Sequence, residues 1–379
     1  MRTIGIGMLG AGFIGQMHSL TFGGVHRSRC QPQVRARLVV LAEENQSLAR
    51  EVQERYDWDS ASQDWRSVLQ NTGVEIFVNA GPNDVHAAPN IAAASSGKHV
   101  FSEKPLARTA DEAFSIWQAA ERGKIKHMCA FIHRFIPALQ LARRIIRSGD
   151  LGRIRHFRSQ FLIDMQHPGG ALSWRYSTSA AGGGATGDLG SHHIDLARFL
   201  VGEVRRVGAM VRSWSSDANR RIIDVNDDWF AASAELDGHA TASFEASRVT
   251  EGHPLTGRIE VDGSQGSLKW NMERVSELYL TQPGTGKRLI TVTRPEDPFA
   301  DFWLPVGIQG SFAIGWRDCF YHQAHHMLAA VALDHPIGPI GATFEDGYHV
   351  AEIVDAIQRS GQSERVEDVA FRRLPAGEI

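Results

Sequence analysis

Hydrophobic residues in the first third of the chain form short apolar runs that alternate with segments of helical periodicity. Short apolar runs bounded by turn residues predict strands, whereas apolar positions three or four residues apart predict helices. The pattern predicts strands at 3–9, 36–42, 74–80, 99–103 and 126–131. It also predicts one helix that ends near Tyr56 and three further helices at 63–70, 84–96 and 111–123. Strands that alternate with helices predict an α/β fold with a parallel, doubly wound sheet.

The pattern changes after a predicted helix at 136–152. Alternating apolar and polar positions predict successive strands in the segments 153–164, 204–214, 228–247, 257–271 and 276–292, with a hairpin turn at Asp237 and Gly238. Two helices are expected late, at 321–333 and 347–360. We therefore predict a first domain at 1–130 and a second, α+β domain at 131–379 with an antiparallel or mixed sheet. The last helix is expected to pack back on the first domain.

Composition narrows the class of protein. The 379 residues, 42% of them hydrophobic, suffice for two buried cores, and a net charge of -3 without long blocks of one sign predicts no nucleic-acid or membrane partner. The odd number of cysteines (Cys30, Cys129 and Cys319) and the lack of C-x-x-C spacing argue against a disulfide framework or structural zinc, and fit a reducing cytoplasm. The sequence contains no run of about 18 apolar residues, and its first residues do not have the pattern of a secretory signal. We therefore expect neither export nor a membrane-spanning helix.

A glycine-rich turn follows the first predicted strand directly. Gly10, Gly12 and Gly15 have the spacing G-x-G-x-x-G, and a helix is expected to begin there. In such turns the first glycine allows the tight turn, the second allows close approach of a pyrophosphate, and the third allows the helix to pack on the strand, while the helix N-terminus attracts the anion. The motif predicts a dinucleotide site.

Glu43 ends the second predicted strand, where an acidic side chain can bind the ribose hydroxyls of a dinucleotide. The distance from Gly15 exceeds the usual ~20 residues, which we attribute to an insertion around 23–33. Alternatively, Glu43 caps the next helix. Glu43 and Glu44 would repel a 2′-phosphate, which predicts NAD rather than NADP.

Two further motifs, "GPNDVH" at 81–86 and "EKP" at 103–105, follow strand ends and should share the carboxyl edge of the sheet, where such sheets bind ligands. The residues that we expect at the cofactor are Gly10, Gly12, Phe13, Ile14, Gly15, Glu43, Pro82, Asn83, His86, Glu103 and Lys104.

The segment "GGGATGDLGSHHID" (182–195) has three interpretations: a metal site, a helix with a glycine-rich start, or half of a catalytic centre. Apolar positions between 187 and 202 predict a helix, on which Asp188 and His192 share a face and Asp195 lies one turn on. No metal is expected, because an H-E-x-x-H or comparable pattern is absent. His322 and His326 also lie four apart, a spacing that is equally typical of an amphipathic helix face.

Lys104 follows a strand end and precedes a proline. Its ammonium is expected to reach the active edge of the sheet, where burial could lower its pKa enough to assist proton transfer. The simpler alternatives are a surface lysine in a proline turn and, for Asp188, an acid that stabilises a helix N-terminus.

Five segments in order, "GAGFIG", "GPNDVH", "EKPLA", "AGGGATGDLGSHHID" and "VDGSQGSL", resemble the glucose-fructose oxidoreductase / inositol dehydrogenase / MocA (Gfo/Idh/MocA) family over nearly the whole chain. The resemblance implies a Rossmann domain that binds NAD(P), then a domain with an open-faced sheet, and a sugar or polyol between them. Segments 173–184, 187–202 and 344–357 are most similar to the levoglucosan dehydrogenase-like branch, which oxidises the C3 hydroxyl of pyranosides.

The family's catalytic lysine, aspartate and histidine fall on Lys104, Asp188 and His192, and His193 falls outside the motif. The resemblance implies that His192 is the base, that Lys104 polarises the oxygen, and that Asp188 holds the imidazole or binds the sugar; Lys104 and His192 could exchange roles. The expected substrate contacts are Lys104, His133, Trp174, Arg175, Asp188 and His192.

We also expect a homodimer or homotetramer formed through the second sheet. Two other functions remain open from the sequence. One is a non-catalytic NAD-binding regulator. The other is an enzyme that retains NAD for redox-assisted glycoside cleavage or epimerisation.

Overall fold

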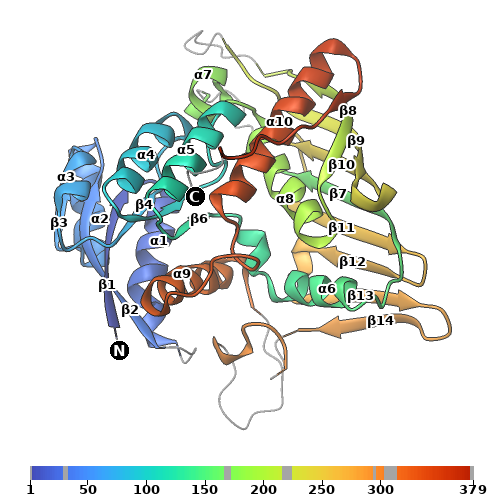
Figure 1. The fold of residues 1–379 in the computed structure, drawn as a ribbon, viewed down its shortest axis with the longest axis horizontal. Helices are drawn as coiled ribbons and strands as arrows, with labels where there is room; N and C mark the ends of the chain where they lie inside the picture. Colours follow the sequence, from blue (N-terminus) through green and yellow to red (C-terminus); the bar gives the residue numbers. More distant parts are fainter. Residues whose placement is uncertain are drawn as a thin grey trace.

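A computed structural model of the protein describes residues 2–28, 33–165, 172–215, 224–292, 296–302 and 314–375. Its first part is a six-stranded sheet in the order β3-β2-β1-β4-β5-β6, in which every strand pair is parallel (Figure 1). The elements of this part are β1 (Arg2–Leu9), α1 (Phe13–Gly24), β2 (Val34–Ala42), α2 (Gln46–Tyr56), β3 (Ser60–Ser62), α3 (Arg66–Gln70), β4 (Ile76–Asn79), α4 (Ala87–Ser95), β5 (His99–Ser102), α5 (Ala110–Arg122) and β6 (His127–Cys129).

This strand order confirms the predicted doubly wound sheet. The order reverses between β1 and β4, and sheets of this kind bind ligands beside such a reversal, outside the carboxyl ends of the strands. The sequence pattern missed β3, because a three-residue strand of small polar residues has no apolar run. The insertion predicted around 23–33 contains the end of α1 and a 3₁₀ turn at Val25–Arg27. Residues 29–32, with Cys30, lie outside the described residues.

The second part contains a nine-stranded sheet in the order β14-β13-β12-β11-β7-β10-β9-β8-β15. It is mixed, as expected, because β7 and β10 pair in parallel and the other pairs are antiparallel. Its elements are α6 (Pro137–Arg147), β7 (Ile154–Leu162), α7 (Thr178–Ala181), α8 (Ser191–Leu200), β8 (Val204–Arg212), β9 (Trp229–Leu236), β10 (Thr241–Ser247), β11 (Thr256–Gly263), β12 (Ser267–Asn271), β13 (Glu277–Gln282), β14 (Gly286–Thr291), α9 (Trp316–Leu333), α10 (Phe344–Ser363) and β15 (Glu367–Asp368).

Helices α6, α8 and α10 contact the nine-stranded sheet on the face toward the first domain, and Figure 1 shows no helix of the described residues on its other face. This is the open-faced sheet that we expected. The last helix packs back on the first domain, as predicted, because α10 contacts α5. Helix α9 does the same against α1 and β2, which the sequence pattern did not predict.

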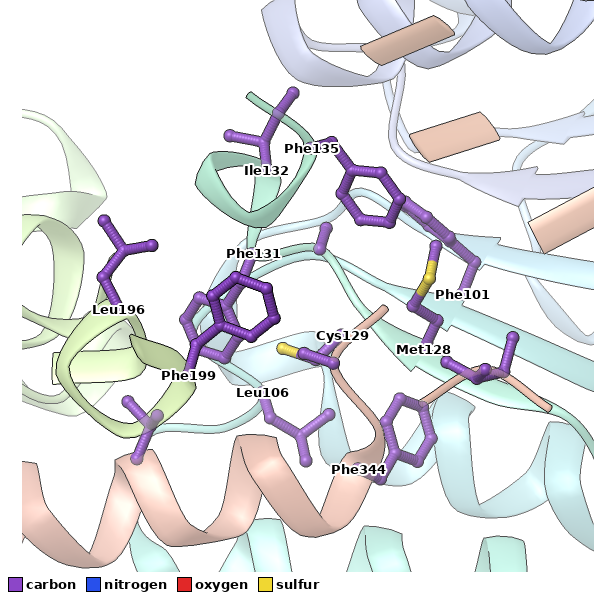
Figure 2. Packing of buried hydrophobic residues seen from close by; sticks show 14 of the residues in the cluster. Phe101, Leu106, Met128, Cys129, Phe131, Ile132, Phe135, Leu196, Phe199 and Phe344 are labelled. Carbon is purple, nitrogen blue, oxygen red and sulfur yellow. The ribbon is translucent and has the colours of Figure 1, made fainter. Parts of the chain in front are cut away.

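The two parts share one hydrophobic core. Figure 2 shows apolar side chains from β5, β6, α8 and α10 gathered in a single cluster, among them Phe101, Cys129, Phe199 and Phe344. All four are nearly inaccessible to solvent, with exposed fractions of 5% or less. Because this cluster fixes α8 and α10 against the first sheet, side chains of α8 are held at the strand ends of the first domain.

Among the described residues, no helix is both long and apolar enough to cross a membrane.

Candidate active site

The glycine-rich loop has the geometry that its spacing predicts. Gly10 has a φ of +96°, and a Cβ there would lie 2.6 Å from the carbonyl oxygen of Ala80. A Cβ on Gly15 would lie 2.1 Å from the carbonyl oxygen of Gly10, so the helix can pack on the strand only with glycine. A Cβ on Gly12 would meet nothing within 4 Å, and Gly12 precedes α1 without any side-chain cap. The first amides of α1 therefore remain available for a pyrophosphate.

Glu43 lies directly after β2, beside the glycine-rich loop. Its Oε2 accepts a hydrogen bond of 2.9 Å from the backbone N–H of Ala11, and its Oε1 accepts one of 3.0 Å from the N–H of Asn45. The cap of α2 is Asn45 rather than Glu43, because the Asn45 side chain accepts from Ser47 and Leu48. Glu43 thus holds the glycine-rich loop through Ala11, and its contact with a ribose stays a prediction.

The "GPNDVH" motif joins the loops at the strand ends to one another. Pro82 precedes a 3₁₀ turn at Asn83–Val85, and the Asn83 side chain donates to the carbonyl of Ala181 over 2.8 Å. Both ring nitrogens of the buried His86 lie close to carbonyl oxygens, at 2.9 Å from Pro105 and 3.0 Å from Gly81. Burial lowers the pKa of His86. Asn83 and His86 therefore position the loops around the site, and direct contact of either with a cofactor stays a prediction.

Glu103 and Lys104 follow β5 at the same edge. Glu103 bonds His18 of α1 over 2.8 Å through one oxygen and accepts the Lys104 N–H through the other. The Lys104 side chain, 17% exposed, extends to the second domain, where its Nζ lies 2.6 Å from Oδ1 of Asp188 and 3.2 Å from the Asp188 carbonyl oxygen. The interpretation of Lys104 as a surface lysine is therefore wrong.

Asp188 lies in a π-helical turn, Thr186–Gly190, which leads into α8. Burial raises the pKa of its carboxyl, but the charges of Lys104 and Arg175 and the hydrogen bond from Lys104 outweigh burial, so the net pKa is lowered. The carboxylate is therefore charged at neutral pH. Arg175, which stacks on the half-buried Trp174, approaches Asp188 to 4.0 Å. Asp188, Trp174 and Arg175 thus lie close together, and their contact with a substrate stays a prediction.

Asp227 is a positioning residue that the sequence did not reveal. Its carboxylate accepts from the N–H groups of Gly184 and Thr186 at 2.7 and 2.8 Å, and also from the Thr186 hydroxyl and the Gln358 amide. A Cβ on Gly184 would lie 1.9 Å from the Asp227 carbonyl oxygen, so this approach requires glycine. These hydrogen bonds fix the glycine-rich segment at 182–184, which directly precedes the π turn in the chain. A single aspartate before a strand gives no sign of such long-range bonds.

His192 belongs to a cluster of three buried histidines, which also contains His133 and His193. Its ring stacks on His133 at 4.4 Å between centroids, and His193 lies 5.9 Å from His133 and stacks on Phe161 at 5.0 Å. Burial, then His133, Lys104 and His193, hold the pKa of His192 well below its usual range. Burial and Lys104 lower the pKa of His133 to about 3. All three rings are therefore neutral at pH 7.

Within the described residues, no hydrogen bond joins Asp188 to His192; the carboxylate pairs with Lys104 instead. Asp188 lies in the π turn and His192 in the helix that follows it, and each has a different partner, Lys104 for the carboxylate and His133 for the imidazole ring. His192 Nδ1, His133 Nδ1 and both nitrogens of His193 are buried without partners in the described part of the chain.

The residues considered for a metal have other partners. Asp195 forms a buried ion pair with Arg134 at 2.6 Å, and Arg134 also bonds Asp346 of α10. His322 bonds the Phe135 carbonyl oxygen and His326 that of Ile337. No group of three or more histidine, cysteine or acidic side chains among the described residues is arranged to hold a metal ion. The pattern alone did not predict the role of Arg134, which ties α8 to α10.

Comparison with protein families agrees with this geometry. Residues 4–131 match the family model described as "Oxidoreductase family, NAD-binding Rossmann fold", and residues 139–269 match the one described as "GFO/IDH/MocA C-terminal domain". The fold is thus that of an NAD-binding oxidoreductase. The chain belongs to the Gfo/Idh/MocA family.

Several relatives match over the full length. Levoglucosan dehydrogenase of Pseudarthrobacter phenanthrenivorans is 34% identical, over 97% of this chain and 99% of its own. The structure of levoglucosan dehydrogenase in complex with NADH and levoglucosan has a TM-score of 0.91 at 34% identity, covering 98% of this chain and all of the other. Inositol 2-dehydrogenase of Rhizobium meliloti is 26% identical over 97% of this chain and 100% of its own.

Proposed function

We propose that this NAD-dependent oxidoreductase oxidises one secondary hydroxyl, at C3, of a sugar, glycoside, anhydrosugar or inositol. The observation that carries the proposal is the bond between Lys104 and Asp188, which joins the two domains at the carboxyl edge of the first sheet. A similarity to levoglucosan dehydrogenase and to inositol dehydrogenase over the whole chain supports a polyhydroxylated substrate.

The glycine-rich loop and Glu43 would hold NAD, because the loop leaves the amides of α1 free and Glu43 stands at the end of β2. NAD supplies the hydride acceptor at the nicotinamide C4 carbon. Pro82, Asn83, His86 and Glu103 would keep the surrounding loops in place. No metal has a role in this proposal.

Lys104 would donate a hydrogen bond to the reacting oxygen, and Asp188 would fix the direction of that ammonium. The bond of 2.6 Å between them means that Lys104 is already oriented before substrate arrives. His133, which stacks on His192, and Arg175, which stacks on Trp174 and approaches Asp188, would contact the remaining hydroxyls together with Trp174.

His192 would accept the hydroxyl proton while hydride leaves the same carbon, so that the products are a ketone, NADH and one proton. The His192 ring is neutral at pH 7, so one of its nitrogens has a lone pair that can accept this proton. Once the hydroxyl is deprotonated, the ammonium of Lys104 would stabilise the developing negative charge.

The test is a spectrophotometric screen of NAD reduction against glucosides, anhydrosugars and inositols. The proposal predicts free NADH that accumulates in proportion to the substrate consumed. A protein that binds NAD without reducing it with any of these compounds would instead be a regulator. Product formation without net NADH would identify an enzyme that keeps its cofactor and cleaves or epimerises the sugar.

We also propose that copies associate through the open face of the second sheet. Met210 in β8 and Trp214 just after it are 54% and 63% exposed, and a cavity of about 810 Å³ lies over β7 to β11 on this sheet. We expect light scattering to show a dimer or tetramer for the wild type and a monomer for Met210→Glu. A monomeric wild type would contradict the proposal.

A cytoplasmic location is a further proposal, supported by Cys129 and Cys319, which are buried free thiols.

A further inference from the structure

A basic cleft of about 990 Å³ lies at the opposite edge of the first sheet from the glycine-rich loop. The cleft is bounded by the starts of β1 and β2, the ends of α1 and α2, and the first turns of α9. We call it the basic cleft because five arginines and one histidine line it, namely His26, Arg27, Arg35, Arg37, Arg55 and Arg317. The 3₁₀ turn of the first crossover, which lies in the insertion noted from the sequence, forms one of its walls.

The arginines of the cleft differ in whether their charge is already neutralised. Arg37 pairs with Asp59 at 2.7 Å, and Arg55 pairs with Glu51 at 2.7 Å. Among the described residues, the side chains of Arg27, Arg35 and Arg317 form no hydrogen bond or ion pair. The cleft therefore holds three guanidinium groups whose donors are available to a ligand.

The acids of the cleft do not balance these charges. Besides Asp59, the lining includes Asp57 and Asp318, and Asp318 accepts a hydrogen bond of 2.6 Å from the N–H of Gly315 at the start of α9. Its carboxylate is thus already used to cap the helix. The lining as a whole contains five arginines against three aspartates, on a chain whose net charge is -3.

The cationic groups of the cleft come from separate elements and line one cavity. Burial and the positive charges of Arg35 and Arg27 lower the pKa of His26, which lines the cavity beside them. On the opposite wall, a Cβ on Gly24 would lie 3.2 Å from the hydroxyl of Tyr321, which brings α9 against the end of α1. Donors from the first crossover and from α9 therefore face one cavity.

We propose that the basic cleft is a second ligand site, separate from the cofactor site, which binds a small phosphorylated anion. Arg27, Arg35 and Arg317 would bind the phosphate oxygens, since a guanidinium presents paired donors that match phosphate geometry. The Tyr321 hydroxyl would be a fourth donor. The volume suits a small molecule, because ligand pockets usually enclose about 300–1,000 Å³. A nucleic acid is not favoured, because this cluster of positive charge is confined to one cleft of an acidic chain.

The test is calorimetric titration of inorganic pyrophosphate into the protein saturated with NADH, so that the pyrophosphate site of the cofactor loop is filled. We expect saturable binding of one pyrophosphate per chain. Arg35→Ala and Arg317→Ala should each weaken it about ten-fold or more, as the loss of a charge-assisted bond implies. Arg147→Ala, which removes an exposed arginine of α6 outside the cleft, should leave it unchanged.

Thermal unfolding of each variant checks that it is folded, since all three side chains are exposed and their removal should leave the melting temperature unaltered. Absence of pyrophosphate binding to the NADH-saturated wild type would overturn the proposal. Equal binding by Arg35→Ala, Arg317→Ala and wild type would also overturn it, because the anion would then lie elsewhere. Tighter binding of a short single-stranded oligonucleotide than of pyrophosphate would reject a small-molecule site.

Discussion

The ammonium of Lys104 lies 2.6 Å from Oδ1 of Asp188, although 84 positions and a domain boundary separate the two residues in the chain. The glycine-rich segment, held by Asp227, places Asp188 there, and the strand end of β5 places Lys104. The geometry of the site thus depends on both domains.

Replacing Asp188 by asparagine tests whether its charge orients Lys104. The pKa of Asp188 is lowered by Lys104 and Arg175 against the effect of burial, so the carboxylate is charged at neutral pH. Asp188→Asn keeps the size but removes this charge. We expect kcat to fall about ten- to hundred-fold with little change in NAD affinity, since charge-assisted bonds are the stronger ones. An unchanged kcat would mean that the ion pair has no part in orienting Lys104.

Cofactor preference tests the placement of Glu43. We expect a higher kcat/KM with NAD than with NADP, because the Glu43 carboxylate would repel a 2′-phosphate. Glu43→Gln keeps an acceptor for the Ala11 N–H but removes the charge, so it should narrow the preference without abolishing NAD binding. A wild-type enzyme that prefers NADP, or a variant with unaltered preference, contradicts this assignment.

Buried neutral histidines predict how stability depends on pH. The pKa of His133 is about 3 in the folded protein and near 6.5 when exposed, so its contribution is fully present above pH 6.5 and is lost as pH falls toward 3. His133→Phe should remove roughly 1.4 kcal/mol per pH unit from the slope of unfolding free energy below pH 6.5. Urea unfolding between pH 7 and 4 measures this slope.

The control is His239→Phe, since the His239 side chain is 84% exposed and its loss should leave the slope nearly unchanged. Identical slopes for wild type and His133→Phe would show that His133 is not buried in its neutral form.

His193 separates packing from chemistry within the histidine cluster. It is 2% exposed and stacks on Phe161, so His193→Ala should destabilise the fold by about 2–4 kcal/mol through a cavity. His193→Phe fills the space and removes two unpartnered nitrogens, and should be neutral or stabilising. Both variants should keep most of their kcat per folded molecule. A large loss of kcat in His193→Phe would assign the base to His193 instead.

Periodicity alone predicted most of the fold, because buried parallel strands and amphipathic helices have distinct apolar patterns. It failed where a contact depends on distant parts of the chain. The π turn at Thr186–Gly190 has no sequence signal, and helical spacing predicts neither the pairing of Asp188 with Lys104 nor the stacking of His192 on His133. The four bonds of Asp227 likewise arise only in the fold.

The backbone geometry of the glycine-rich loop was easier to predict, since the glycine spacing directly encodes a backbone shape. The motif around Asn83 and His86 correctly pointed to the strand edge, but their side chains turn to Ala181, Pro105 and Gly81. The sheet topology determines that these residues lie at the carboxyl edge of the first sheet. The direction of their side chains depends on which neighbouring loop packs against them. The sequence also did not reveal the stacking of His133 on His192, because His133 lies in a turn 59 positions before His192 in the chain.

The central claim is that Lys104 and His192 act on one substrate hydroxyl, and kcat in the single and double variants tests it most directly. Lys104→Met and His192→Phe keep the stem and the aromatic packing and remove the proton chemistry. Each should lower kcat by about 10² to 10⁴ with the dissociation constant of NAD nearly unchanged, and the double variant should be far less impaired than the product of the two losses. A kcat within a few-fold of wild type in either single variant, measured with bound NAD, would contradict the account.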